Sequence, residues 1–282
     1  MPLLREEPAE KLRLYQLDEV LTEKDSDRFS VVISFVGFCA ARNKIKRMQP
    51  QMSLTNLKRE LRKYARKDKA SLLQRYFKTG PGEYAEGDIF IGVQVPYIRK
   101  VAGRYQGLSI KDTLSLLKSA IHEERLLALL ILVLKFAKAD QLERKKIYLS
   151  YLAHTRYINN WDLVDLTAHH IVGAFLEDKS RKLLYSLARS RSLWERRIAI
   201  LATFYFIRQR EFSDALSIGR MLLRDKEDLI HKASGWMLRE VGKRDKSKLV
   251  YFLDKYRLKM PRTMLRYAIE RFPEPERKKY LG

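Results

Sequence analysis

Cysteine is nearly absent from this sequence, since Cys39 is the single thiol among 282 residues. One thiol excludes an internal disulfide framework and a cysteine-rich metal site, and it favours a reducing compartment. Glycine and proline are also scarce, at 12 and 8 residues. Several of them fall between predicted helices, as in the stretches 79–88, 259–263 and 272–276, where they mark breaks in regular structure.

Long apolar runs are missing as well. The longest uncharged run, residues 29–41, has charged residues on both sides, and it is shorter than the roughly 20 residues that a membrane-spanning helix needs. The start of the chain, residues 1–16, mixes acids with bases, and it lacks both the apolar core of a secretory signal and the acid-poor character of a transit peptide. We therefore expect no membrane span and a cytoplasmic protein.

Acidic residues are the third shortage. The chain has 34 Asp and Glu against 57 Lys and Arg, which gives a formal net charge of +23 and a pI near 10.0. Solubility does not require so large an excess of positive charge. The excess indicates a polyanionic partner, most often nucleic acid and sometimes an anionic membrane surface. The 46% of hydrophobic residues suffices for one large domain or for a stack of repeats with a continuous core.

From about residue 53 onward, apolar residues recur every three or four positions, and no long window shows strand-like alternation. This pattern predicts an all-α fold. Five long helices are expected to start at residues 122, 160, 193, 228 and 261, so that successive starts are spaced by 38, 33, 35 and 33. Amphipathic helices precede them, among them 109–120, 140–153, 180–190 and 212–224.

A two-helix unit that recurs at this period is typical of a HEAT-like helical-repeat solenoid, because one helix pair cannot bury its own apolar face. An irregular helical bundle is the alternative. In a solenoid the second helices would line a concave basic groove, which is the expected binding surface. Residues 1–50 do not join the pattern, so we treat them as an N-terminal appendage of uncertain order, followed by a repeat domain over 51–282.

The predicted helix that starts at residue 160 carries an unusual combination of side chains. Trp161, Asp165 and His169 are four residues apart, so they share one ridge of the helix. The simpler interpretation is a core tryptophan beside a surface carboxylate. An anion on a groove that only held DNA would repel phosphates, however, and would lower the affinity. Asp165 therefore calls for a structural or a chemical reason.

The following repeats place further side chains near this ridge. Arg196 and Arg197 lie one turn into the next helix, in register with Asp165. The helix after that carries Trp236 among basic residues, which are His231, Lys232 and Arg239. The expected groove thus combines aromatic faces, arginines and one carboxylate.

Hydrolysis of an N-glycosidic bond would use such a set of groups. The reaction passes through an oxocarbenium-like sugar, which a nearby carboxylate stabilises while it orients the attacking water. Tryptophan faces hold cations with about 0.5 to 2 kcal/mol each. A purine that is already cationic leaves without a general acid. This agrees with the absence of an obvious second catalytic carboxylate, since Asp162, the nearest one, points about 100° away around the helix.

Four stretches of the chain, 75–102, 159–166, 193–200 and 231–245, together resemble the DNA alkylation-repair glycosylase family of HEAT-like repeats, the AlkD-like proteins. The resemblance covers most of the chain beyond residue 53. It implies a curved solenoid that embraces duplex DNA and excises cationic N3- and N7-alkylated purines, without drawing the base into a pocket as most glycosylases do.

By position, the resemblance assigns the catalytic aspartate to Asp165 and the two lesion-facing tryptophans to Trp161 and Trp236. It assigns the phosphate-contacting arginine to Arg197 and a tyrosine that frames the site to Tyr76. We expect three more residues to contact DNA, namely Arg196, Lys232 and Arg239. Two features depart from the family pattern: the N-terminal appendage, and the stretch 79–88, which is longer than in the shortest members.

Other motifs are weaker. The stretch 80–88 contains three glycines but no GK[ST], so it is not a phosphate-binding P-loop, and we interpret it as a polar turn or as a loop that contacts DNA. His154, His169 and His170 show no metal-ligand spacing. We therefore expect no metal and no cofactor.

These observations predict a monomeric DNA glycosylase of a bacterial type, associated with the nucleoid through its duplex DNA partner. Some related proteins lack the acid and bind DNA without excision. A non-catalytic reader of distorted or branched DNA on the same scaffold is therefore one alternative. A scaffolding solenoid that binds a peptide or an acidic protein is the other.

Overall fold

The computed structural model describes residues 52–282, which fall within one compact unit, Gln49–Gly282. These residues form helices joined by turns and contain no β-strand, although an isolated bridge pairs Ile89 with Ile121. The predicted all-α helical-repeat fold is thereby confirmed. None of the described helices combines the length and the apolar character needed to cross a bilayer. The appendage predicted for residues 1–50 lies outside the described residues.

The second helices begin at or within one residue of their predicted starts. They are α6 His122–Lys138, α8 Trp161–Asp165, α10 Leu193–Ala202, α13 Asp228–Arg244 and α15 Arg262–Ala268. The helices that precede them in the repeats are α5 Ile110–Leu117, α7 Gln141–Ala153, α9 Lys182–Leu187, α12 Ser213–Met221 and α14 Lys246–Tyr256. The remaining α-helices are α2 Leu54–Arg62, α3 Lys67–Tyr76, α4 Val95–Arg104, α11 Phe204–Arg208 and α16 Glu274–Leu281.

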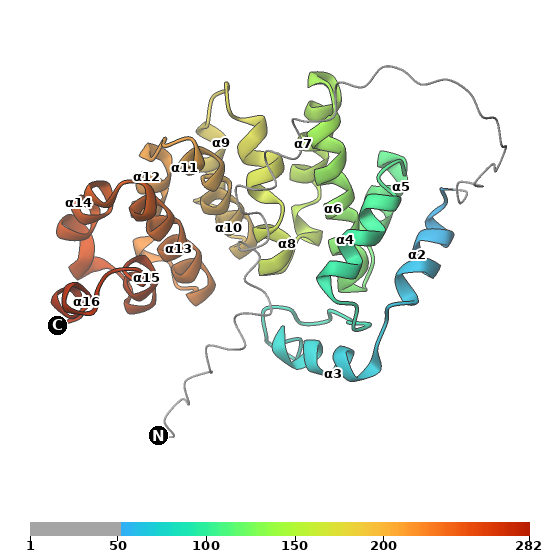
Figure 1. The fold of residues 1–282 in the computed structure, drawn as a ribbon, viewed down its shortest axis with the longest axis horizontal. Helices are drawn as coiled ribbons and strands as arrows, with labels where there is room; N and C mark the ends of the chain where they lie inside the picture. The colour runs from blue at the N-terminus through green and yellow to red at the C-terminus, as the bar shows by residue number, and fades with distance from the viewer. Residues whose placement is uncertain (1–51) are drawn as a thin grey trace, which may run out of the picture. The chain divides into compact units, whose positions relative to one another are not determined.

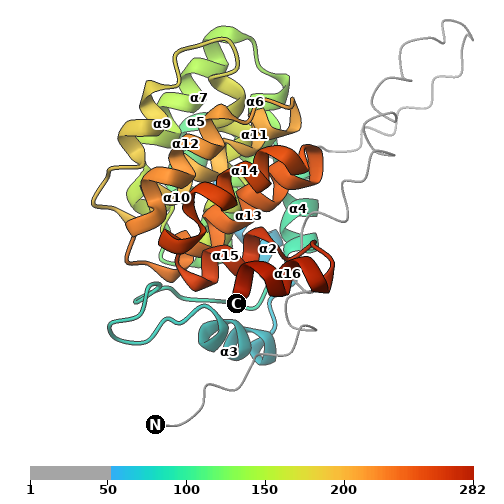
Figure 2. The same cartoon turned by 90° about the vertical axis from the view of Figure 1, so that its left-hand side faces the viewer.

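Helices that follow one another in the sequence also pack together. α5 packs on α6, α9 on α10 and α12 on α13, while α13 also packs against α10 and α15 of the neighbouring repeats (Figure 1). Both views show α3 and the chain that follows it running along one end of these helices (Figure 2). This arrangement brings α3 and the loop after it close to the first turns of the second helices.

Two glycines allow neighbouring repeats to approach closely. A Cβ atom on Gly173 would lie 2.4 Å from the carbonyl oxygen of Ala202, and one on Gly235 would lie 2.5 Å from that of Met264. Because real Cβ atoms do not approach oxygen so closely, only glycine fits at either position. Each glycine precedes its carbonyl partner by the same number of positions in the sequence. The same helix contact is therefore built twice.

The helix expected from residue 160 to 176 is interrupted. α8 ends at Asp165, and a π-helix, η3, spans His169–Gly173. Between them the Thr167 hydroxyl donates to the Leu163 carbonyl at 2.5 Å and pairs with the Tyr151 hydroxyl at 2.9 Å, so side-chain bonds compete with the regular backbone ladder. Asp165 consequently lies at a helix end, next to the kind of π-bulge that recurs at functional sites.

Candidate active site

Asp165 and Arg197 form a two-pronged salt bridge between α8 and α10. The Arg197 Nε donates to Asp165 Oδ1 at 2.8 Å, and Nη2 donates to Oδ2 at 2.7 Å. The remaining terminal nitrogen, Nη1, donates to the Leu229 carbonyl in the first turn of α13. Arg197 therefore joins three successive repeats at one point, in the register that the sequence predicts.

The pair is sheltered but remains accessible. The side chains of Asp165 and Arg197 are 12% and 6% exposed, so the pair is largely enclosed but not sealed from solvent. Burial raises the pKa of Asp165 above its usual value, and the Arg197 guanidinium opposes that rise. A carboxylate offers about four lone-pair positions. The two bonds from Arg197 thus leave acceptor positions free for another group.

Trp161 begins α8 one turn before Asp165, and aromatic rings from α3 and the following turn surround it. Its ring stacks on Phe77 with centroids 5.0 Å apart and planes at 13°, and it meets the ring edge of Tyr76 at 6.1 Å and 74°. Trp161 and Tyr76 are partly exposed, whereas Phe77 is buried beneath them. The structure therefore brings Tyr76 and Trp161 together, and their roles at the site stay predictions.

Trp236 lies further along its helix than the Asp165–Arg197 pair. Its ring is 6.3 Å from Phe204, whose ring is in turn 5.3 Å from His169, one turn beyond Asp165. On α13, the residue that contacts the Asp165–Arg197 pair is Leu229. Trp236 lies seven residues further along this helix, about 10 Å along its axis. The Trp236 indole nitrogen is buried and has no hydrogen-bond partner among the described residues.

Sequence analysis missed the buried polar residues in the first turn of α6. His122, Glu123, Glu124 and Arg125 are each at most 3% exposed. The run of four polar residues before a long apolar stretch was the available signal. Periodicity placed only a helix start there, because the partners of these residues come from distant parts of the chain.

His122 links the site helix to the loop before α4. Its Nε2 lies 2.8 Å from Asp162 on α8, and its Nδ1 lies 3.2 Å from Asp88, which also pairs with Arg125 at 2.7 Å. Burial alone lowers the pKa of His122, but the carboxylates outweigh it and raise that pKa to about 9. The ring is therefore an imidazolium at neutral pH and donates to both acids, which fixes Asp162 beside Trp161.

Glu123 fixes the end of the same loop. Its carboxylate accepts backbone N–H bonds from Ile91, Gly92 and Val93 at 2.7 to 3.2 Å. Gly92 has a φ of +82°, and a Cβ atom there would lie 2.0 Å from the Arg66 carbonyl. The first turn of α6 therefore determines where the loop between α3 and α4 runs.

The model of the DNA alkylation repair enzyme family matches residues 57–272, which is most of the chain. The protein belongs to this family. A solved structure described as a predicted DNA alkylation repair enzyme from Enterococcus faecalis matches with a TM-score of 0.58 and 14% identity, over 74% of this chain and 97% of that chain. At this identity the likeness shows the fold alone. No curated protein matches the chain.

In this DNA alkylation repair family member, two of the predicted DNA-contacting cations already have protein partners. Arg196 forms a two-pronged salt bridge with Asp225 at 2.6 and 3.1 Å, and its Nη1 donates to two backbone carbonyls. Lys232 pairs with Asp228 at 3.0 Å, but its side chain is 42% exposed. Lys232 is thus the more accessible of the two, and DNA contact stays a prediction for both.

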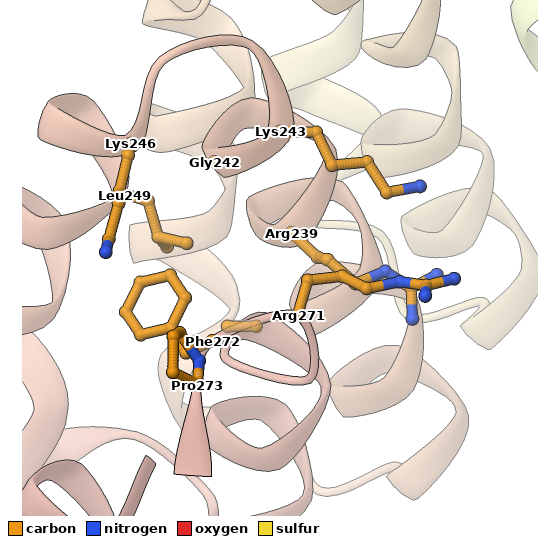
Figure 3. Close-up of a pocket in the computed structure, with 9 residues that line it drawn as sticks. Arg239, Gly242, Lys243, Lys246, Leu249, Arg271, Phe272 and Pro273 are labelled. Atoms are coloured by element: carbon orange, nitrogen blue, oxygen red, sulfur yellow. The ribbon is translucent and has the colours of Figure 1, made fainter. Parts of the chain in front are cut away.

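Arg239 borders a cavity of about 180 Å³ that is lined by α13, α14, the end of α15 and the turn after it. Figure 3 shows the side chains of Arg239, Arg271 and Lys243 extending toward one side, while Leu249 and Phe272 form an apolar wall. Arg239 also pairs with Glu270. Cationic side chains such as these contact phosphates in protein–DNA complexes, and the DNA contact of Arg239 stays a prediction.

His169 and His170 lie in η3 with ring centroids 3.9 Å apart. Burial lowers the pKa of both rings, to about 4 for His170, and the nearby charge of Arg208 lowers it further. Both rings are therefore neutral at pH 7. Among residues 52–282, no group of three histidine, cysteine, aspartate or glutamate side chains has the arrangement of a metal site.

Proposed function

We propose that this DNA alkylation repair family member is an N-glycosyl hydrolase that releases cationic N3- and N7-alkylated purines from duplex DNA. Family membership supports a role in DNA repair. The observation that carries the finer proposal is the Asp165 side chain, which is sheltered but still 12% exposed, one turn from a partly exposed Trp161. The formal charge of +23 fits a DNA partner.

The chemistry follows from the charges that develop in the reaction. As the bond from the sugar to the purine breaks, the sugar becomes an oxocarbenium-like cation, and the Asp165 carboxylate stabilises it electrostatically and orients water toward C1′. An alkylated purine that already carries a positive charge leaves as a neutral base. The reaction then requires no general acid, and Asp162 remains bound to His122 throughout.

Trp161 supplies the contact to the lesion in this proposal. An alkylpurine cation against an indole face gains about 0.5 to 2 kcal/mol. The Phe77 ring beneath Trp161 and the Tyr76 edge beside it hold the indole in place before the lesion arrives. Trp236, about two helical turns further along α13, would contact the duplex through the exposed part of its ring.

Arg197 has two roles in the proposal. Three of its five N–H groups bind Asp165 and the Leu229 carbonyl. The two that remain would contact a phosphate next to the lesion, because a guanidinium forks between acceptors in one plane. Arg197 would thus hold the carboxylate and the backbone at a fixed separation, which places the sugar over Asp165.

Release of a free base from methylated duplex DNA is the direct test. The parent protein is expected to release methylated purines, identified by chromatography and mass spectrometry. Asp165→Asn should slow release on the order of 100-fold or more, about 3 kcal/mol in the chemical step, while the affinity for the duplex stays equal or rises because an anion has been removed.

The outcomes separate the alternatives. A folded Asp165→Asn variant that releases bases at the parent rate would show that Asp165 is structural. Strong binding of damaged or branched duplex without release by the parent would favour a non-catalytic reader. Absent or salt-independent DNA binding would favour a scaffolding protein, since binding to phosphates weakens steeply as the salt concentration rises.

A further inference from the structure

A buried tyrosine of α7 contacts the end of α8. Tyr151 is 0% exposed, and its hydroxyl pairs with the Thr167 hydroxyl at 2.9 Å. Thr167 is fully buried as well, and its hydroxyl donates to the Leu163 carbonyl at 2.5 Å. Because that bond uses the only proton of the Thr167 hydroxyl, the phenol is the donor between the two side chains. This hydroxyl pair of Tyr151 and Thr167 therefore links α7 to the backbone of α8.

The hydroxyl pair closes a turn of the chain that has Asp165 at its centre. Thr167 and Leu163, which the side-chain bond joins, stand two residues to either side of Asp165. In a regular helix the Thr167 N–H would donate to the Leu163 carbonyl, but here it donates to the Val164 carbonyl at 3.1 Å. The Thr167 hydroxyl serves the Leu163 carbonyl instead. The backbone that carries the Asp165 carboxylate is therefore held by a contact from α7.

The partner of Asp165 is anchored independently of this turn. Arg197 on α10 donates through Nη1 to the Leu229 carbonyl on α13, so the next repeat fixes its guanidinium. The two bonds to Asp165, at 2.8 and 2.7 Å, require both carboxylate oxygens to lie against the fork of that guanidinium. Because the guanidinium is held from α13, the carboxylate must be brought to it by its own backbone. The geometry of the pair therefore depends on the turn that the hydroxyl pair closes.

We propose that Tyr151 and Thr167 are positioning residues, which hold the end of α8 so that the Asp165 carboxylate faces the sugar of the lesion. The proposal rests on the proposed glycosylase function. Both side chains are fully buried, so they act through Asp165 and do not touch the reacting atoms. A group that stabilises a developing charge has to be held within about 0.5 Å of its productive position. A buried contact from a second helix provides that restraint.

Thr167→Val is the first test, because it removes the hydroxyl and keeps a β-branched side chain. Single-turnover release of methylated bases at saturating protein should fall about 10- to 100-fold, since a misplacement of about 1 Å costs a reaction up to 10²-fold. Affinity for the methylated duplex should not change, because no contact to DNA is removed. Thr167→Ser keeps the hydroxyl and should restore most of the rate. A thermal melt verifies that each variant is folded.

Tyr151→Phe perturbs the same hydroxyl pair more mildly, because the bond from Thr167 to the Leu163 carbonyl stays in place. Release should fall about 3- to 10-fold, the scale of one hydrogen bond. The double variant Tyr151→Phe/Thr167→Val should be no slower than Thr167→Val alone, because both changes remove the same contact. Losses that multiply in the double variant would overturn the joint role of the two residues.

Thr113→Val is the matched control. Thr113 on α5 is fully buried, and its hydroxyl donates at 2.8 Å to the Ser109 carbonyl, four residues back, as that of Thr167 does to Leu163. Its replacement should lower the melting temperature as Thr167→Val does, and it should leave the release rate unchanged. Equal losses of rate in the two valine variants would assign the effect to stability and would overturn the positioning role.

An NMR measurement tests the same role without activity. The Nε–H signal of Arg197 in ¹⁵N–¹H spectra of the full-length protein, assigned by its absence from Arg197→Lys, reports the bond to Asp165. This signal should move upfield in Thr167→Val, return in Thr167→Ser and stay unchanged in Thr113→Val. An unmoved signal in a folded Thr167→Val variant would overturn the positioning role. A moved signal, with a parent protein that releases no base, would support the positioning of the carboxylate and refute the glycosylase function.

Discussion

The first turns of α6 and α10 share one polar framework and use it for different purposes. In α6, Ser119 donates to Glu124 at 2.7 Å, and Arg125 binds the Ser119 carbonyl at 3.1 Å. The same contacts recur in α10, two repeats later. Ser190 donates to Glu195 at 2.6 Å, and Arg196 binds the Ser190 carbonyl at 3.0 Å.

The positions beside this framework differ. Where α6 has His122, Glu123 and Leu126, α10 has Leu193, Trp194 and Arg197. The first set anchors the loop before α4 and the core, whereas Trp194 and Arg197 contact Tyr84 and Asp165. The two repeats thus keep the same serine, glutamate and arginine at the start of the helix. They differ at the neighbouring positions, which in α10 carry a ring and a charge.

Arg197→Leu gives α10 the residue that α6 has, and it should have the largest effect. Asp165 would remain as a sheltered carboxylate without its cation, so the free energy of unfolding at pH 7 should fall by about 4 kcal/mol. Urea unfolding measures the loss. The double variant with Asp165→Asn should recover most of it, and a double variant no more stable than Arg197→Leu would show that packing, not charge, was lost.

His122→Leu makes the reverse exchange, because Leu193 is the residue of α10 that corresponds to His122. The free energy of unfolding should fall by about 3 kcal/mol near pH 6, because two buried acids lose their shared cation. The pKa of His122 is raised from 6.5 to about 9. Its stabilising contribution is therefore complete below pH 6.5 and is lost as the pH rises through about 9. Urea midpoints of parent and variant should converge toward pH 9.5. A difference that does not depend on pH would contradict the charged role.

Ser119→Ala and Ser190→Ala sharpen the shared part of the comparison. Each serine hydroxyl donates to a glutamate, and each accepts a backbone N–H, from Ile121 at 3.1 Å or from Ser192 at 3.0 Å. Equivalent contacts should give equal losses of unfolding free energy, about 1 kcal/mol each. Paired thermal or urea melts measure both variants. Losses that differ by more than twofold would show that the framework has diverged.

The smallest effect concerns the acid side of the pH–rate profile. Burial raises the pKa of Asp165, against the opposing charge of Arg197 and with Asp162 and the Tyr151 hydroxyl nearby. Since the ionised form stabilises the sugar cation, single-turnover release should decline as the pH falls, with a midpoint above the usual aspartate value of 3.8. Spontaneous depurination without protein is subtracted. A rate that does not change down to pH 4 would contradict a catalytic Asp165.

The fold was accessible from the sequence because helix patterns are local. Apolar residues three and four positions apart identify each helix, and the repeat period places the helices in order, so the start of α6 at His122 and that of α10 at Leu193 agree with prediction. The register of Arg197 against Asp165 followed from the same alignment. The predicted basic groove, in contrast, depends on side-chain directions across several repeats and stays a prediction.

Local patterns by themselves determined where the second helices of this protein begin, that Trp161 and Asp165 share one face, and that the chain is strongly basic. The tertiary structure decided the rest. It buried His122 between acids that lie 34 and 40 residues away, set Trp236 in a separate layer, and brought Tyr84 onto Trp194. Such contacts join segments distant in the chain, and no period in the sequence encodes them, because they form only when the stacked helices fix the distance between those segments.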